Sequence, residues 1–90
     1  MTEAVYLKSA EYRGGFKLYL EFSTGEAGEV DLEDIIFRYQ QAQSLRDPAS
    51  FAKFYLDSWP TLAWDCGFDV APESLYRRYL ETLPARVQNA

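Results

Sequence analysis

Histidine is absent from the 90-residue chain, and cysteine occurs once, as Cys66. Without histidine the chain contains no Ser-His-Asp or Cys-His nucleophilic site. A single cysteine excludes an internal disulfide, cannot supply a zinc site, and fits a reducing compartment. We therefore expect a cytoplasmic protein that holds no metal and no cofactor.

Long apolar runs and an excess of positive charge are also missing. No stretch approaches the roughly 20 apolar residues that span a bilayer, and the N-terminus lacks the basic and apolar regions of a signal peptide. Acidic residues outnumber basic ones by 14 to 9, which gives a net charge of −5. Because phosphate binding depends on cationic surface, we expect neither direct nucleic-acid binding nor a membrane role.

Apolar residues make up 48% of the chain and aromatic residues 17%, enough to offset chain entropy in a short protein. The length favours one domain, expected over residues 1–83 and followed by a frayed tail over 84–90.

Strand patterns fill the first third of the chain. Phe16, Leu18, Leu20 and Phe22 alternate with polar residues, the period of a half-buried strand. Residues 4–12 and 26–31 read as neighbouring strands, and glycine-containing turns separate the three segments. This arrangement predicts an antiparallel meander.

The pattern then becomes helical. Leu32, Ile35, Ile36 and Tyr39 lie at the spacing of a buried helix stripe, which predicts a helix over 32–39 with Asp31 as a cap. Residues 40–45 read as a polar connection.

Residues 48–53 follow Asp47-Pro48, a typical helix start, and predict a short helical turn. Segments 54–58 and 61–65 read as a second hairpin around Trp59-Pro60. Pro72 begins a last helix that carries an apolar stripe through Leu83. The predicted fold is α+β: a three-stranded antiparallel meander plus a second hairpin, with two or three short helices packed on the sheet.

The segment from Trp64 to Tyr76, WDCGFDVAPESLY, resembles the W-x-x-G-x-D-x-x-P-x-x-L-Y signature of the family known as domain of unknown function 2442. The motif residues are Trp64, Gly67, Asp69, Pro72, Leu75 and Tyr76. Cys66 departs from the family pattern, in which a polar residue is frequent. The resemblance covers roughly residues 3–80.

The resemblance implies a small bacterial α+β domain with no established activity. Some relatives carry a helix-turn-helix domain after this module, and we expect none here. Other relatives are encoded beside a second small protein, as in toxin–antitoxin pairs. This implies a protein partner.

The motif has a structural interpretation. Gly67 would adopt a positive φ in a turn, Asp69 would accept hydrogen bonds from the following backbone amides, and Pro72 would start the helix. The alternatives are an anion-binding loop at a helix N-terminus, or an enzyme or small-ligand site that uses Asp65 and Asp69 in an enclosed pocket beside Trp64. We favour the structural interpretation and expect no enzymatic activity.

Two candidate interaction surfaces remain. Five carboxylates without a cation between them lie within nine residues: Glu26, Glu29, Asp31, Glu33 and Asp34. They are either a solvated edge, a surface for a basic protein, or a mimic of nucleic-acid phosphates. We expect Arg77 and Arg78 to be solvated.

Aromatic residues form the second candidate surface. Alternation places Tyr6, Tyr12 and Tyr19 on the outer face of the first hairpin, and Trp59 in a turn. The function predicted from the sequence is a non-catalytic protein-interaction module that binds another protein or a second copy of itself. The accessory or antitoxin-like half of a small bacterial protein pair is such a module.

Overall fold

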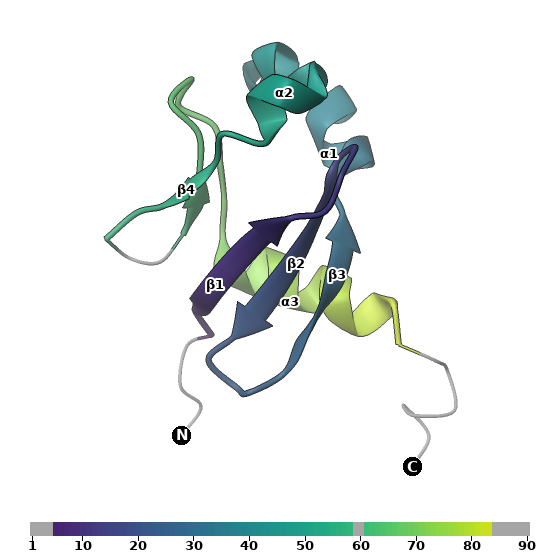
Figure 1. The fold of residues 1–90 in the computed structure, drawn as a ribbon, viewed down its shortest axis with the longest axis vertical. Coiled ribbons are helices and arrows are strands. Elements are labelled where there is room, and N and C mark those ends of the chain that lie inside the picture. The colour runs from purple at the N-terminus through teal and green to yellow at the C-terminus, as the bar shows by residue number, and fades with distance from the viewer. Residues whose placement is uncertain (1–4, 59–60, 84–90) are drawn as a thin grey trace.

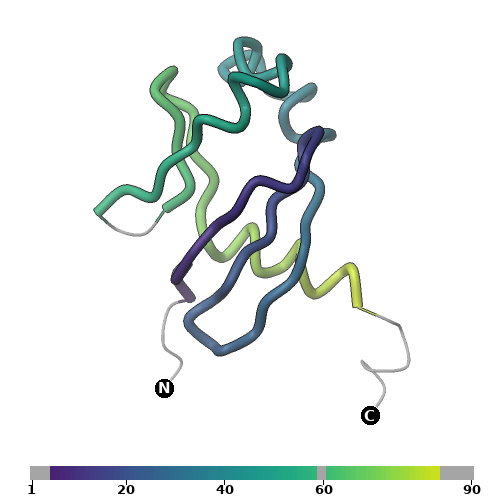
Figure 2. The backbone as a smooth tube through the Cα atoms, viewed as in Figure 1, coloured from purple at the N-terminus to yellow at the C-terminus, as the bar shows by residue number. Residues whose placement is uncertain are grey.

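The computed structural model describes residues 5–58 and 61–83 and shows an α+β fold (Figure 1). The turn expected at Trp59-Pro60 and the tail expected over 84–90 lie outside the described residues. Figure 2 shows how the chain builds a sheet, passes through short helices at one end of it, and returns to lay its last helix across the back.

The predicted meander is confirmed as β1 (Leu7–Tyr12), β2 (Lys17–Phe22) and β3 (Ala27–Asp31), in the order β1-β2-β3. Leu18, Leu20 and Phe22 are fully buried on one face of β2, as their alternation predicts. The opposite face of this sheet carries Ser9, Glu11, Lys17 and Tyr19, which are exposed.

Strand β1 contains an irregularity that the sequence pattern did not indicate. Leu7 pairs with Phe22 but Ser9 pairs with Glu21, so one residue bulges between them. A bulge shifts the two-residue period by one position. The second half of β1 therefore turns Ala10 and Tyr12 toward the core face, against the strict alternation that we had expected.

The second hairpin is confirmed but is shorter than predicted, with β4 (Tyr55–Leu56) pairing with β5 (Leu62–Ala63). A further strand, β6 (Asp69–Val70), pairs with β5 and makes a small sheet of order β4-β5-β6. The sequence predicted no strand there, because a two-residue strand is too short to show a period.

Three α-helices form where helices were predicted: α1 (Glu33–Arg38), α2 (Pro48–Phe51) and α3 (Pro72–Glu81). The expected polar connection is instead a 3-10 helix, η1 (Gln40–Arg46), which buries Ala42 and Leu45. Helix α3 lies across the core face of the larger sheet, whereas α1, η1 and α2 gather at one end (Figure 1).

Aromatic rings join these parts into one core. Phe51 of α2 lies 5.3 Å from the Phe16 ring and 5.5 Å from the Trp64 ring. The Phe22 ring of β2 lies 5.4 Å from the Tyr79 ring of α3. Gly28 is required on β3, because a Cβ there would lie 2.5 Å from Cε1 of Tyr79.

Candidate functional site

Trp64, the first residue of the family motif, is a core residue. It is 2% exposed, and its Nε1 donates a 2.7 Å hydrogen bond to the buried carbonyl of Phe51. The indole lies between the rings of Phe51 and Phe68. Burial and a satisfied N–H account for this tryptophan without any ligand.

Gly67 closes the turn that leads into β6. Its φ is +96°, as predicted, and its N–H donates to the carbonyl of Trp64. The neighbouring Cys66 is exposed, and its thiol lies 3.6 Å from the carbonyl of Gln41. This turn fixes where β6 begins.

The roles predicted for the two motif-region aspartates are not found. Asp65 and Asp69 are both exposed, and neither side chain accepts a hydrogen bond from the described residues. Asp69 lies in β6, where its backbone is extended and does not form the turn needed to accept from following amides. The two carboxylates line different hollows, so they form no shared polar pocket beside Trp64.

The last motif residues anchor α3. Pro72 occupies its first turn, and Leu75 is fully buried. The hydroxyl of Tyr76 donates a 2.5 Å hydrogen bond to Oε1 of Glu26, in the turn before β3. This hydrogen bond to a carboxylate, together with desolvation, raises the pKa of Tyr76. The motif therefore links α3 to the sheet.

The acidic stretch is not one continuous surface. Glu26 binds Tyr76 and also accepts from the hydroxyl of Thr24. Asp31 accepts from the backbone N–H of Glu33, the first residue of α1, but the N-cap of this helix is Leu32 and not Asp31 as predicted. Glu29 and Glu33 are exposed, and neither side chain forms a hydrogen bond or ion pair with the described residues.

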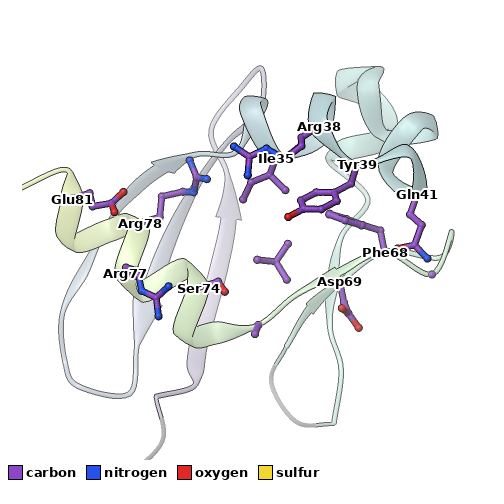
Figure 3. Close-up of a pocket in the computed structure, with 13 residues that line it drawn as sticks. Ile35, Arg38, Tyr39, Gln41, Phe68, Asp69, Ser74, Arg77, Arg78 and Glu81 are labelled. Atoms are coloured by element: carbon purple, nitrogen blue, oxygen red, sulfur yellow. The ribbon is translucent and has the colours of Figure 1, made fainter.

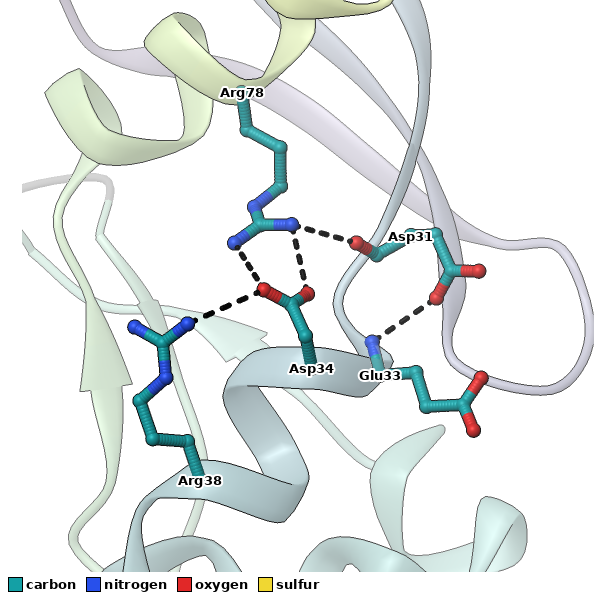
Figure 4. Close-up of polar contacts among 5 residues, drawn as sticks. All are labelled: Asp31, Glu33, Asp34, Arg38 and Arg78. Atoms are coloured by element: carbon teal, nitrogen blue, oxygen red, sulfur yellow. Dashed lines mark hydrogen bonds and ion pairs between the residues drawn. The ribbon is translucent and has the colours of Figure 1, made fainter.

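Asp34 is held by arginines rather than left open. Two guanidinium nitrogens of Arg78 donate to its carboxylate at 2.8 and 3.0 Å, and Arg38 lies 3.8 Å away (Figure 4). Arg78 also donates to the carbonyl of Asp31. These hydrogen bonds hold the pKa of the Asp34 carboxyl below its ordinary value. Arg78, predicted to be solvated, is therefore only 26% exposed and ties α3 to α1.

The predicted aromatic surface is partly wrong. Tyr6 and Tyr19 are 50% and 37% exposed, but Tyr12 is half-buried against the Phe51 ring because of the bulge in β1. The hydroxyl of Tyr12 donates to the carbonyl of Gly15. Trp59 lies outside the described residues.

Two exposed aromatics that the sequence analysis missed stand at the end of α1. Phe37 is 50% exposed and Tyr39 is 48% exposed. The predicted helix stripe placed Tyr39 in the core, but α1 ends at Arg38 and the backbone of Tyr39 is extended. The guanidinium of Arg46 lies 5.3 Å from the Phe37 ring, and that of Arg38 lies 6.0 Å from the Tyr39 ring. Phe37 lies outside the predicted apolar stripe of this helix, and that position was the signal in the sequence for its exposure.

A cleft of about 530 Å³ opens beside this point (Figure 3). One wall is the end of α1 and the start of η1, and the other is β6 followed by α3. Arg38, Arg77 and Arg78 line it together with Tyr39 and Phe68, whose rings are 6.1 Å apart.

A second hollow lies on the other side of α1. It is lined by Phe37, Arg78 and the acidic residues Asp31, Glu33 and Asp34. Arg78 thus borders both hollows, and α1 forms the ridge between them.

The charges of the main cleft are mixed. Arg78 is committed to Asp34, whereas Arg77 has no ion pair with the described residues. Asp69 and Glu81 are two exposed acidic residues of the lining, and the Asp69 carboxylate points away from Tyr39 and Phe68 (Figure 3). The described residues place no three His, Cys, Asp or Glu side chains where they could hold a metal ion, and include no helix able to cross a membrane.

The fold and this site define a small α+β module with an open cleft between its helices and its smaller sheet. The chain belongs to the family described as protein of unknown function (DUF2442), whose sequence pattern it matches over residues 7–81. No curated protein matches the chain.

A solved structure shares this fold. It is the crystal structure of a putative DNA-binding protein from Nitrosomonas europaea, with a TM-score of 0.76 and 28% sequence identity to this chain. The similarity covers 91% of this chain but only 54% of that one, so the chain spans about half of its relative's length.

Proposed function

We propose that this chain is a protein-binding module and that its contact surface is the α1–α3 face. This face consists of five residues: Phe37, Arg38, Tyr39, Arg77 and Arg78. The observation that carries the proposal is the convergence of the two hollows on α1, with a half-exposed aromatic bordering each. Aromatic and arginine side chains in such hollows are the residue types that dominate binding energy at protein interfaces.

The partner that we propose is another protein, of the kind that would make this chain the accessory or antitoxin-like half of a pair. The half-exposed ring of Phe37 supports this proposal, because it has no polar group that could form a hydrogen bond with water. Burial of that exposed half against a partner would contribute to binding through the hydrophobic effect.

Mimicry of nucleic acid receives less support. Phosphate mimicry needs a row of open carboxylates, whereas Glu26, Asp31 and Asp34 already accept hydrogen bonds within the chain. The name of the Nitrosomonas protein suggests direct DNA binding. The net charge of −5 in this chain disfavours it, because DNA phosphates are bound by cationic surfaces.

Affinity capture with matched variants tests the proposal. The tagged chain is incubated with lysate of its source cells, alongside the double variant Phe37→Ser/Tyr39→Ser. The control is Tyr6→Ser/Tyr19→Ser, which removes two comparably exposed tyrosines from outside the α1–α3 face. Circular dichroism melts confirm that all three chains fold.

We expect the first double variant to lose about 90% or more of the captured partner, since truncation of hot-spot residues costs about 2 kcal/mol or more. The control should retain the partner. Equal retention by both variants, or loss only in the control, would contradict the proposal.

A further inference from the structure

Strand β6 forms one edge of the smaller sheet. The order is β4-β5-β6, and no other strand of the described residues pairs with β6. The N–H of Trp64 donates to the carbonyl of Phe68, and Leu62 pairs with Val70. Because hydrogen-bonded and non-hydrogen-bonded pairs alternate in an antiparallel ladder, the N–H and C=O of Asp69 point away from β5.

This free edge belongs to the wall of the main cleft. The lining includes the unbroken run 67–71, and within it the exposed Asp69 stands between the buried residues Phe68 and Val70 (Figure 3). An occupant of the cleft therefore meets main-chain donors and acceptors at Asp69 that no described strand satisfies. An extended peptide satisfies them with its own main chain, as in β-strand addition.

A second copy of the chain fits this edge poorly. Antiparallel pairing of two β6 edges around a two-fold axis would bring Asp69 near Asp69 of the other copy, and like charges in facing positions destabilise a strand pair. A basic side chain in the occupant removes that conflict. Among the other charges of the lining, Arg38 and Arg78 both pair with Asp34. Arg77 and Glu81 on α3 carry opposite charges, so Asp69 on the edge itself sets the preference.

We propose that an extended segment of the partner protein adds to β6 as a fourth strand, with a lysine or arginine facing Asp69. This inference rests on the proposed function and names its mode of recognition. Main-chain hydrogen bonds provide affinity, and the side chain facing Asp69 provides selectivity. Tyr39 and Phe68 border the same cleft and contact the neighbouring side chains of the added strand.

The test uses linear decapeptides selected on the purified chain from a random phage-displayed library. Binding of a synthetic selected peptide is measured by fluorescence anisotropy to two variants, Asp69→Pro and Asp69→Ala. Proline at this position removes the carboxylate and the outward N–H but leaves the ladder to β5 intact, and edge strands tolerate it. Alanine removes the charge but keeps the N–H.

We expect Asp69→Pro to weaken binding about tenfold or more, and Asp69→Ala to weaken it less while losing the preference for a basic residue. A second measurement leaves the protein unchanged, so it does not depend on the folding of Asp69→Pro. It compares the binding of peptides that carry a single backbone N-methyl group at each position in turn. Methylation at alternate positions should abolish binding, since only one set of amides faces the edge.

Three results would overturn this inference: no selected peptide, uniform tolerance of N-methylation, or amide chemical-shift changes that spare residues 67–71. If any of these occurred while Phe37→Ser/Tyr39→Ser still lost the captured partner, the α1–α3 face would stand as a binding surface and only the strand-addition mode would fail.

Discussion

Replacing Trp64 with phenylalanine tests whether the family motif stabilises the fold or serves to bind a ligand. The change removes the indole N–H that binds the buried Phe51 carbonyl at 2.7 Å. A buried acceptor left unpaired costs about 1–3 kcal/mol, and the smaller ring leaves a void worth roughly 1 kcal/mol more. We therefore expect the free energy of unfolding to fall by about 2–4 kcal/mol.

For a domain of this size, that loss corresponds to a melting temperature lower by roughly 10–25 °C. Urea unfolding followed by circular dichroism measures the free energy directly. The control is Tyr55→Phe, which removes a hydroxyl from a side chain that is 46% exposed and should change stability by less than about 0.5 kcal/mol. Unchanged stability in Trp64→Phe would refute the structural interpretation of the motif.

Two further changes test how α3 is held. Gly28→Ala places a Cβ 2.5 Å from Cε1 of Tyr79, so we expect a loss of about 1–3 kcal/mol in urea unfolding; full stability would contradict the packing of α3 on β3. Arg78→Met breaks the pair with Asp34, which is half-exposed and therefore worth about 1 kcal/mol at most. Because the folded pKa of Asp34 is lowered, its stabilisation is complete above its ordinary pKa of 3.8 and is lost as the pH falls through the folded value. The difference between wild type and Arg78→Met should therefore shrink below about pH 4, and a gap that widened in acid would contradict this assignment.

The larger sheet was predictable because its pattern is long and regular. The alternation over residues 16–22 marks β2, and glycine-containing turns mark both ends. The bulge in β1 was not predictable, since it is specified by pairing with β2 rather than by residues of β1 alone. Because of this bulge, Tyr12 packs against the Phe51 ring and does not lie on the predicted outer surface.

The candidate site was harder to predict because short elements build it. Strand β6 has two residues and η1 lies in a polar segment, so neither shows a period. The end of α1 at Arg38 turned Tyr39 from an expected core residue into an exposed one. The pairing of Arg78 with Asp34 joins residues 44 positions apart, a contact that only the fold brings together.

Chemical-shift mapping of the isotopically labelled chain with its captured partner locates the contact surface. We expect amide signals to change over residues 35–41 and 67–81, which contain the cleft walls, while those of Ser9, Glu11 and Tyr19 on the outer face of the larger sheet stay in place. Changes centred on that outer face, with the cleft signals unmoved, would contradict it.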